Sequence, residues 1–160
     1  MKGDSGAFDL LIVFLAAILL TILALPMFRS YTLREHNKMA EAALEDAQAR
    51  ARNWRAMHPG RRLGSLEDLG YPAIALYVTS DGTVRGAANL ASVYRISLAY
   101  PSAAAEENCG LGGGDPPDYV LIAEPIQTQR IDDRCGRLCI AATGRHGNSG
   151  PASVQECWGR

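Results

Sequence analysis

The sequence lacks the residue patterns that mark the common classes of enzyme site. The glycine-rich stretch at residues 110–114 has no Gly-Lys-Ser/Thr after it, so it is not a phosphate-binding loop. His36, His58 and His146 are far apart in the sequence and show no metal-ligand spacing. No nucleophile elbow of the Gly-x-Ser-x-Gly type occurs. We therefore expect a protein that is not an enzyme and that holds no metal or other cofactor.

The chain also lacks a large net charge, since 16 basic and 17 acidic residues give −1 at neutral pH. No global field attracts or repels nucleic acid, so a charged partner must meet a local patch. A basic, glycine-rich segment can follow a phosphate backbone, although small solvated basic surfaces are common and we favour that simpler interpretation. The C-terminal third has such a basic bias, carried mainly by four arginines: Arg130, Arg134, Arg137 and Arg145.

Cysteine is absent from the first 108 residues, and the chain contains no Cys-x-x-Cys pair. The closest two cysteines are Cys135 and Cys139, a spacing that fits neither the usual zinc sites nor a thioredoxin-like redox motif. An even number of cysteines in a loop-rich segment instead predicts two disulfides and export to an oxidising compartment. The four cysteines are Cys109, Cys135, Cys139 and Cys157.

No charged residue interrupts the run from Leu10 to Phe28, which is mostly aliphatic. As a helix this run is ~28 Å long, close to the hydrocarbon thickness of a bilayer. A buried core helix is the first alternative, but a domain of this size can hardly cover a helix that is apolar on all sides. A cleaved signal peptide is the second, but its apolar region is usually shorter. We expect a single membrane-spanning helix, with the cysteine-containing domain outside the cytoplasm although more basic residues follow the run than precede it.

The helix is predicted to continue to Met57, because no glycine or proline follows the apolar run before Pro59. In this second half the apolar residues recur at helical spacing and form one face. Pro26, near the junction of the two halves, is expected to kink or loosen the helix. The predicted apolar face consists of Leu33, Ala40, Leu44, Ala47, Ala51 and Trp54.

Three later segments have the composition of β-strands: residues 93–100, 118–126 and 136–142. No helix-length connection joins them, so antiparallel pairing is expected. Residues 66–71 are predicted to form a short helical turn, and residues 80–83 a tight turn. The fold class predicted is α+β, with a long N-terminal helix packed on a small antiparallel sheet. Residues 1–9 form a short N-terminal segment, residues 10–28 the apolar half-helix, and residues 29–160 the globular part, which includes the amphipathic half-helix 29–57.

Several short motifs, in this order, resemble those of the type IV pilins. Asp9 is followed by Leu-Leu-Ile-Val and, further along, by Ala24-Leu-Pro-Met27, which resembles the pilin pattern of an acid, an aliphatic run and a Leu-Pro. The remaining motifs are similar to a subfamily of minor pilins that includes receptors for DNA uptake. They are Glu41-Ala-Ala-Leu44, Leu66-x-x-Leu69-Gly-Tyr71, Tyr94-Arg-Ile-Ser-Leu98, Asp132-Asp-Arg-Cys-Gly136 and Cys157-Trp158.

The resemblance implies that the chain is a minor subunit of a type IV pilus. Its apolar half-helix, with Asp9 and Pro26, would pack against other pilin subunits in the filament. Asp9 would meet the free N-terminal amine of a neighbour, since a carboxylate beside an apolar helix is costly without a partner; a simple interfacial role in headgroup water is the alternative. Before assembly the subunit would sit in the inner membrane with its globular part in the periplasm, and afterwards in the extracellular pilus.

The resemblance also implies processing by a prepilin peptidase, after Gly3 or Gly6. Pilins usually have Glu as the fifth residue after cleavage, whereas Asp9 would become the sixth or the third. N-terminal methylation would follow such processing.

Two disulfides, Cys135–Cys157 and Cys109–Cys139, are implied by the resemblance, the second by elimination. Because Cys135 and Cys139 are four residues apart, they are expected to share a strand face. Two other functions remain open. The first is capture of double-stranded DNA for uptake, through Arg130, Arg134, Arg137 and Arg145. The second is the role of a pseudopilin in a type II secretion system.

Overall fold

The computed structural model describes residues 5–100, 109–111, 118–131 and 134–159, and it leaves out the side chains of residues 5–8, 23–27 and 29. The chain divides into two compact units, an N-terminal unit of residues 1–34 and a C-terminal unit of residues 35–160. Helix α1 (Ser5–Met57) runs through the first unit and into the second. It therefore ends at Met57, the residue predicted from the position of Pro59.

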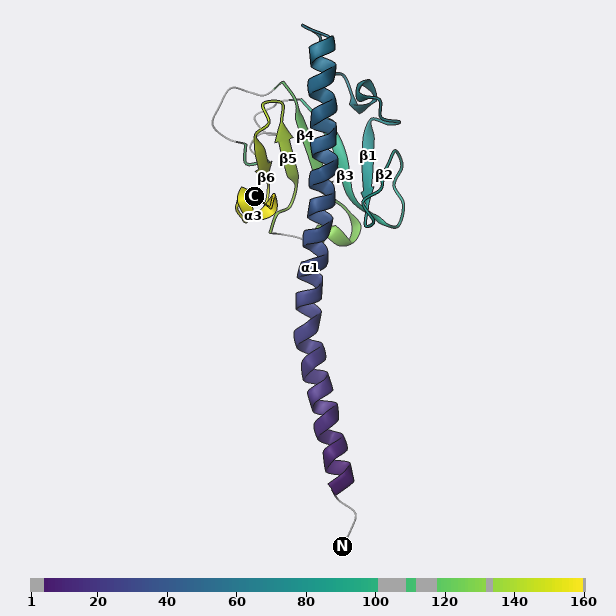
Figure 1. Cartoon of the computed structure of the whole chain (residues 1–160), viewed down its shortest axis with the longest axis vertical. Coiled ribbons are helices and arrows are strands. Elements are labelled where there is room, and N and C mark those ends of the chain that lie inside the picture. Colours follow the sequence, from purple (N-terminus) through teal and green to yellow (C-terminus); the bar gives the residue numbers. More distant parts are fainter. Residues whose placement is uncertain (1–4, 101–108, 112–117, 132–133, 160) are drawn as a thin grey trace. The chain divides into compact units, whose positions relative to one another are not determined.

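Six antiparallel strands form one sheet in the C-terminal unit, in the order β2-β1-β3-β4-β5-β6 (Figure 1). Three of them, β3, β4 and β5, correspond to the three predicted strands, and the coarse α+β prediction is confirmed. The other three were not predicted. The strands are β1 (Ala75–Thr79), β2 (Val84–Arg85), β3 (Ser92–Ala99), β4 (Val120–Pro125), β5 (Leu138–Ala141) and β6 (His146–Asn148).

Part of α1 packs on the sheet through the face that its sequence predicts. Ala40, Leu44, Ala47 and Ala51 are fully buried there, whereas the outer members of the stripe, Leu33 and Trp54, are half-buried. Three of these four are alanines, so the helix backbone can approach the strands closely. The strands supply the larger side chains of the same core: Leu76, Val78, Tyr94, Ile96, Leu121, Leu138 and Ile140.

A buried polar network joins α1 to the sheet at one end of this core. Tyr94 Oη donates to Asn37 Oδ1 at 2.6 Å, and Gln129 Nε2 donates to the same oxygen at 2.9 Å. Gln129 Oε1 lies 2.9 Å from His36 Nδ1. Gln129 belongs to the short helix η2 (Gln127–Ile131), so the network also holds that segment in place. Paired in this way, the amides avoid the cost of burying unsatisfied polar groups.

A second buried contact joins the middle of α1 to the sheet. Gln48 Nε2 donates to the carbonyl of Ala141 at 3.2 Å, and Gln48 Oε1 accepts from Tyr119 Oη at 3.1 Å. Burial raises the pKa of the Tyr119 hydroxyl, which keeps it a donor at any physiological pH. The two networks fix the position of the C-terminal part of α1 along the strands. Alanine side chains alone would specify this position less strictly, because they are small.

The connection from α1 to β1 contains the predicted helical turn, η1 (Leu66–Leu69), whose apolar ends Leu66 and Leu69 are buried. Ser65 and Asp68 form a reciprocal capping box at its start. Tyr71, which follows it, donates from Oη to Asp46 Oδ2 at 2.6 Å. The connection is therefore tied to α1 at its end as well as through its buried leucines.

The predicted tight turn at residues 80–83 joins β1 to β2, and it leads to a pH-dependent prediction. Hydrogen bonds from the Thr79 hydroxyl and the Thr83 N–H hold the pKa of Asp81 at about 2, below its usual 3.8. A carboxyl with a lowered folded pKa stabilises the fold above its unfolded pKa, and this stabilisation disappears as the pH falls from about 4 to about 2. Asp81→Ala should therefore lower the melting temperature at pH 6 but hardly at pH 2. Thermal melts followed by circular dichroism measure this, and an equal shift at both pH values would contradict it.

Candidate functional site

The N-terminal unit presents a helix surface that is apolar on all sides. Its large side chains are half to two-thirds exposed, and they include Leu10, Val13, Phe14 and Leu20. The hydroxyl of Thr21 donates to the carbonyl of Ala17 at 2.8 Å, so the polar group in this surface is satisfied within the helix. An exposed apolar surface of this extent is typical of a segment that is covered by lipid or by other protein chains.

Within the described residues, no helix is both long enough and apolar enough to cross a membrane.

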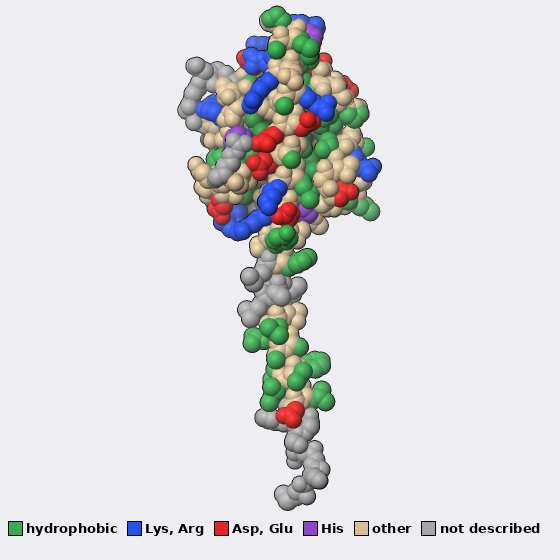
Figure 2. Space-filling view, viewed as in Figure 1, with side chains coloured by type: hydrophobic (Ala, Val, Ile, Leu, Met, Phe, Trp, Pro, Cys, Tyr) green, Lys and Arg blue, Asp and Glu red, His purple; other side chains and the backbone are tan. Residues whose placement is uncertain are grey.

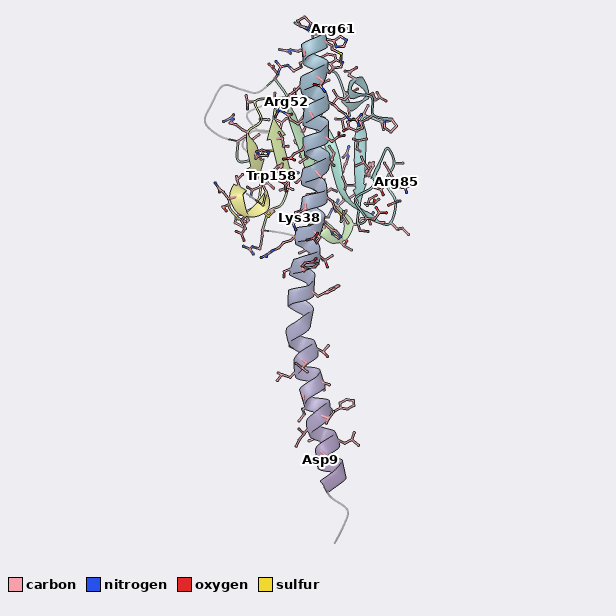
Figure 3. The ribbon with its side chains drawn as sticks, viewed as in Figure 1. Asp9, Lys38, Arg52, Arg61, Arg85 and Trp158 are labelled. Atoms are coloured by element: carbon pink, nitrogen blue, oxygen red, sulfur yellow. A yellow bond between two sulfur atoms is a disulfide. The ribbon has the colours of Figure 1, made fainter. Side chains whose placement is uncertain are left out.

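Asp9 lies at the beginning of this apolar surface, and its side chain is exposed (Figure 3). Of the two candidate cleavage positions, Gly6 lies in the first turn of α1 and Gly3 lies outside the described residues. Pro26 falls within α1, but its side chain is outside the described part. The roles of Asp9 and Pro26 in filament assembly stay predictions.

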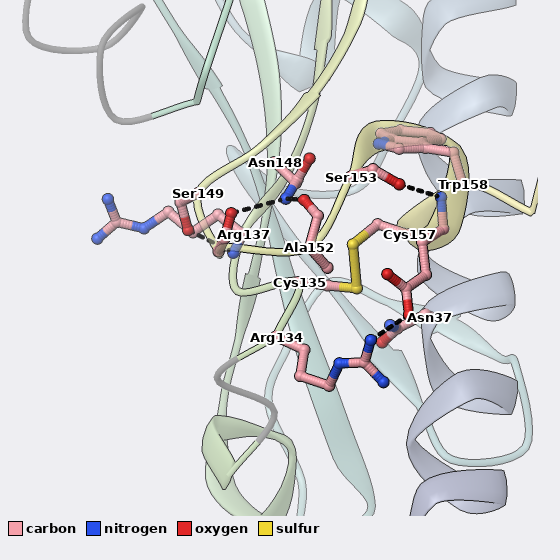
Figure 4. Close-up of a disulfide and its surroundings, with 12 residues drawn as sticks. Asn37, Arg134, Cys135, Arg137, Asn148, Ser149, Ala152, Ser153, Cys157 and Trp158 are labelled. Carbon is pink, nitrogen blue, oxygen red and sulfur yellow. Dashed lines mark hydrogen bonds and ion pairs between the residues drawn. A yellow bond between two sulfur atoms is a disulfide. The ribbon is translucent and has the colours of Figure 1, made fainter.

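The C-terminal segment is closed onto the sheet by the disulfide Cys135–Cys157 (Figure 4). Cys157 ends the short helix α3 (Val154–Cys157), and the next residue, Trp158, is 1% exposed and donates from Nε1 to the carbonyl of Gly147 at 3.1 Å. Asn148 Nδ2 donates to the carbonyl of Ala152 at 2.9 Å and so holds the chain that leads to α3. The glycine-rich tail is thus ordered and is held to the sheet through Cys157 and Trp158, an arrangement that we call the C-terminal closure.

The second disulfide, Cys109–Cys139, lies in a separate cluster of buried residues with Leu111, Val120 and Ala141. These are the two pairs implied by the pilin resemblance. The expectation that Cys135 and Cys139 share a strand face is wrong. Cys135 belongs to the core beneath α1, while Cys139 belongs to this second cluster. The reason is that β5 begins only at Leu138, after Gly136 has taken a positive φ of 62°, so strand alternation does not extend back to Cys135.

The four C-terminal arginines do not form one patch. Arg134 is paired with Glu156, and Arg137 Nη2 lies 3.2 Å from Glu124 Oε1. Arg137 directly precedes β5, whereas Arg145 directly precedes β6 at the other end of this antiparallel hairpin. The four-residue strand separates them by about 13 Å. Arg130 lies exposed in η2, after the end of β4.

The sequence analysis missed a second group of basic residues, which lines a pocket of about 590 Å³ at the C-terminal end of α1. Four arginines line it: Arg52 and Arg55 from α1, and Arg61 and Arg62 from the turn that follows. We call it the arginine pocket. Figure 2 shows basic side chains gathered over this end of the helix, and Figure 3 labels Arg52 and Arg61 there. Among the described lining residues the one acid is Asp118, which is paired with Arg55.

The turn that carries Arg61 and Arg62 is held by several contacts. His58 Nδ1 donates to the carbonyl of Trp54 at 2.9 Å, and its ring stacks on the Trp54 ring at 4.6 Å. Gly60 has φ 78°, a conformation in which a side chain is strained. Beyond the turn, Leu63 is buried, and the hydroxyl of Tyr100 donates to its carbonyl at 2.6 Å. The two arginines therefore extend from an anchored backbone.

One sequence signal could have revealed this pocket. Arginines occur five times between Arg50 and Arg62, a density higher than that of the C-terminal third. The sequence analysis gave these arginines no role in binding. The periodicity of the helix predicts which residues face the sheet, but it does not show that the chain turns back after Gly60 and brings two more arginines beside the first pair.

The described part of the chain contains no evident set of metal ligands. All four cysteines are engaged in disulfides. No group of three or more His, Cys, Asp or Glu side chains lies together within that part.

Comparison with known proteins identifies no family for this chain, so its function has to be inferred from these surfaces. The scan against protein-family models gives no match, and no curated protein matches the chain.

Proposed function

We propose that this protein is a pilin-like subunit of a type IV pilus, held in the inner membrane before assembly and packed by its apolar half-helix into the filament afterwards. The observation that carries this proposal is the two-part character of α1. Its N-terminal unit exposes apolar side chains on all sides, whereas residues 40–51 bury one alanine-rich face against a sheet. A globular domain needs only the second part, so the first part calls for a different environment, either lipid or the same surface on neighbouring subunits.

The disulfides support an extracytoplasmic position for the C-terminal unit. Cys109–Cys139 and Cys135–Cys157 consume every cysteine in the chain, and stable disulfides are rare in reducing compartments. Together they staple the last third of the sequence to the sheet. A subunit that leaves the cell in a filament would benefit from such cross-links, because no chaperone or cellular reductant reaches it there.

Asp9 is the residue that most directly tests the filament proposal. It is the acid at the start of the apolar surface, and it lies close to the N-terminus, where a cleaved chain would carry a free amine. A carboxylate in an apolar environment needs an opposite charge, and the amine of a neighbouring subunit supplies one during packing. The pair would also set the register between neighbouring helices, since any slip along the helix would leave both charges unpaired.

The test compares three forms of the protein in a piliated host: wild type, Asp9→Ala and Asp9→Glu. Immunoblots of sheared filaments and of membranes measure how much subunit is in each. Asp9→Ala should remain in the membrane at the wild-type level but fall at least several-fold in the filament fraction. Asp9→Glu keeps the charge and should restore most of the incorporation.

Normal filament levels of Asp9→Ala would show that Asp9 is an interfacial residue and would remove the main support for assembly through charge pairing. Loss of both variants from the membrane fraction would point to a folding or insertion defect. That outcome would also contradict the proposal, which expects both variants to stay in the membrane because their apolar run is unchanged.

A DNA receptor built on the C-terminal arginines receives less support. Arg134 and Arg137 are paired with acids, and Arg145 lies at the opposite end of the β5–β6 hairpin from Arg137. These positions offer no continuous track for a phosphate backbone. The ordered closure at Cys157 and Trp158 also favours a pilus subunit over a pseudopilin, because that closure belongs to the motifs through which the chain resembles minor pilins.

A further inference from the structure

The arginine pocket concentrates positive charge in a small volume. Four arginines line it, and Asp118 is the one acid among its described lining residues, so these residues carry an excess of three positive charges around about 590 Å³. Asp118 is already paired with Arg55. Within the described residues, Arg52, Arg61 and Arg62 make no ion pair. Like charges that line one pocket repel one another, so the arrangement costs stability unless another group offsets it.

The dipole of α1 accounts for only part of this charge. Cations in the last turn of a helix are stabilised by the partial negative charge of its free carbonyls, equivalent to about half an elementary charge. Arg55 lies in that last turn, and Arg52 lies one turn earlier. Arg61 and Arg62 follow the end of the helix, where the effect has fallen off. The helix end therefore explains one or two of the arginines and leaves the other pair unexplained.

The pocket is also organised in advance of any ligand. Leu63 and Tyr119 also line it and are almost fully buried, and Tyr119 is fixed by its hydrogen bond to Gln48. The turn that carries Arg61 and Arg62 is anchored on either side by His58 and Leu63. Because the backbone is already ordered, binding has to immobilise only the arginine side chains, which lowers its entropic cost.

From this geometry we infer that the arginine pocket binds an anion that carries two or more phosphate groups. A guanidinium group presents its N–H donors as a planar fork that matches two phosphate oxygens at once. The three arginines that make no ion pair within the described residues, Arg52 on the helix and Arg61 and Arg62 on the turn, suit two phosphates better than one. The inference does not depend on the filament assignment, since every residue of the pocket lies in the C-terminal unit.

The same chemistry is available from a free oligophosphate or from the backbone of a nucleic acid, and the test separates these sources. Purified full-length protein, in nonionic detergent and at 50 mM salt, is titrated with pyrophosphate by calorimetry. Two charge-assisted hydrogen bonds correspond to a dissociation constant on the order of 1 mM or tighter. Duplex DNA of twelve base pairs is then added as a competitor. Displacement of pyrophosphate identifies the nucleic acid backbone as a source, and no displacement identifies free phosphates.

Arg61→Ala with Arg62→Ala is the decisive variant, because both residues are exposed and neither takes part in the core. It should weaken pyrophosphate binding at least about tenfold, since loss of one charge-assisted hydrogen bond already corresponds to that factor. The matched control, Arg85→Ala with Arg95→Ala, removes the same charge from strands β2 and β3 outside the pocket and should change the affinity less than about twofold. Equal melting temperatures of the two double variants exclude a folding defect.

Two results would overturn the inference. One is the absence of any heat of binding for the wild-type protein up to 10 mM pyrophosphate. The other is an equal loss of affinity in the pocket variant and in the control, which would mean that only the net charge matters. The Asp9 variants keep the pocket intact, so their failure in filaments would leave this result untouched.

Discussion

Trp158→Ala should lower the free energy of unfolding by about 4 kcal/mol, the range found for removal of a fully buried large aromatic residue. Trp158 is 1% exposed and belongs to the core beneath α1. The change removes the indole from that core, and it also removes the Nε1 hydrogen bond to the carbonyl of Gly147. The edge contact with His146, at 4.3 Å between ring centroids, is lost as well. Urea unfolding of the full-length protein, followed by far-ultraviolet circular dichroism, measures the loss.

The chain offers a matched control in its other tryptophan, Trp54. Trp54 is half-buried and its known ring contact is the stack on His58 at the surface of α1. Trp54→Ala should therefore cost less than half as much as Trp158→Ala. If Trp158→Ala does not fold at all, Trp158→Phe keeps most of the buried volume and should retain a measurable transition at lower urea. A similar cost at both tryptophans would contradict the role given to the C-terminal closure.

Removal of the Cys135–Cys157 disulfide, by changing both cysteines to alanine, should cost about 3 kcal/mol. In the chain-entropy model the loss comes from the unfolded chain, which gains freedom when a loop spanning 22 residues is opened. Alanine is used because it leaves no unsatisfied hydroxyl in the core, where Cys135 and Cys157 are 6% and 4% exposed. Unfolding the wild-type protein in the presence of dithiothreitol, which reduces both disulfides, should show a larger loss than this double variant.

The Cys109–Cys139 disulfide provides the comparison. It spans 30 residues, so the same model gives a slightly larger loss when it is removed. Thiol labelling of the unfolded wild-type protein without reductant should detect no free cysteine. Labelling at all four positions, or a denaturation midpoint that does not change on reduction, would contradict both the disulfides and the extracytoplasmic position proposed for this unit.

The helix was the part of the fold that the sequence predicted best. Its apolar stripe has the period of an α-helix, and Ala40, Leu44, Ala47 and Ala51 are indeed the residues buried against the sheet. Its end at Met57 follows from proline and glycine, which act locally through the backbone. Periodicity could not reveal Asn37 and Gln48, which lie on the buried side of the helix although they are polar. Their burial depends on partners such as Tyr94 and Tyr119, which are more than fifty residues away in the sequence.

The sequence analysis missed β1, although Tyr77, Val78 and Thr79 favour a strand, and it also missed β2 and β6. β6 has the sequence His-Gly-Asn, which carries no intrinsic preference for a strand. Its conformation comes from its pairing with β5 and from the close approach of other backbone: a Cβ on Gly147 would lie 2.1 Å from the carbonyl oxygen of Cys109. Such constraints are tertiary, so they are absent from any local pattern.

The candidate sites likewise divide into those that the local sequence reveals and those that depend on the tertiary structure. Asp9 stands out in the sequence because a carboxylate next to an apolar run is unusual, and that signal is purely local. The arginine pocket is not local, because it needs both the end of α1 and the turn after Gly60. The C-terminal arginines show the opposite error: neighbours in sequence were grouped as one surface, although the β5–β6 hairpin places Arg137 and Arg145 at opposite ends.

The Cys135–Cys157 disulfide has a consequence for the timing of oxidation. Cys157 follows all six strands, so it is the last cysteine to become available when the chain is delivered from its N-terminal end. Cys109 and Cys139 can be joined as soon as β5 has paired, whereas the Cys135 thiol must wait until β6 and α3 have arrived. A chain that stalls before this point carries one reactive thiol, and a finished chain carries none. The Cys135 thiol therefore stays free until β6 and α3 have folded. Until then it can react with a thiol-dependent folding catalyst, and after the Cys135–Cys157 bond has formed it cannot.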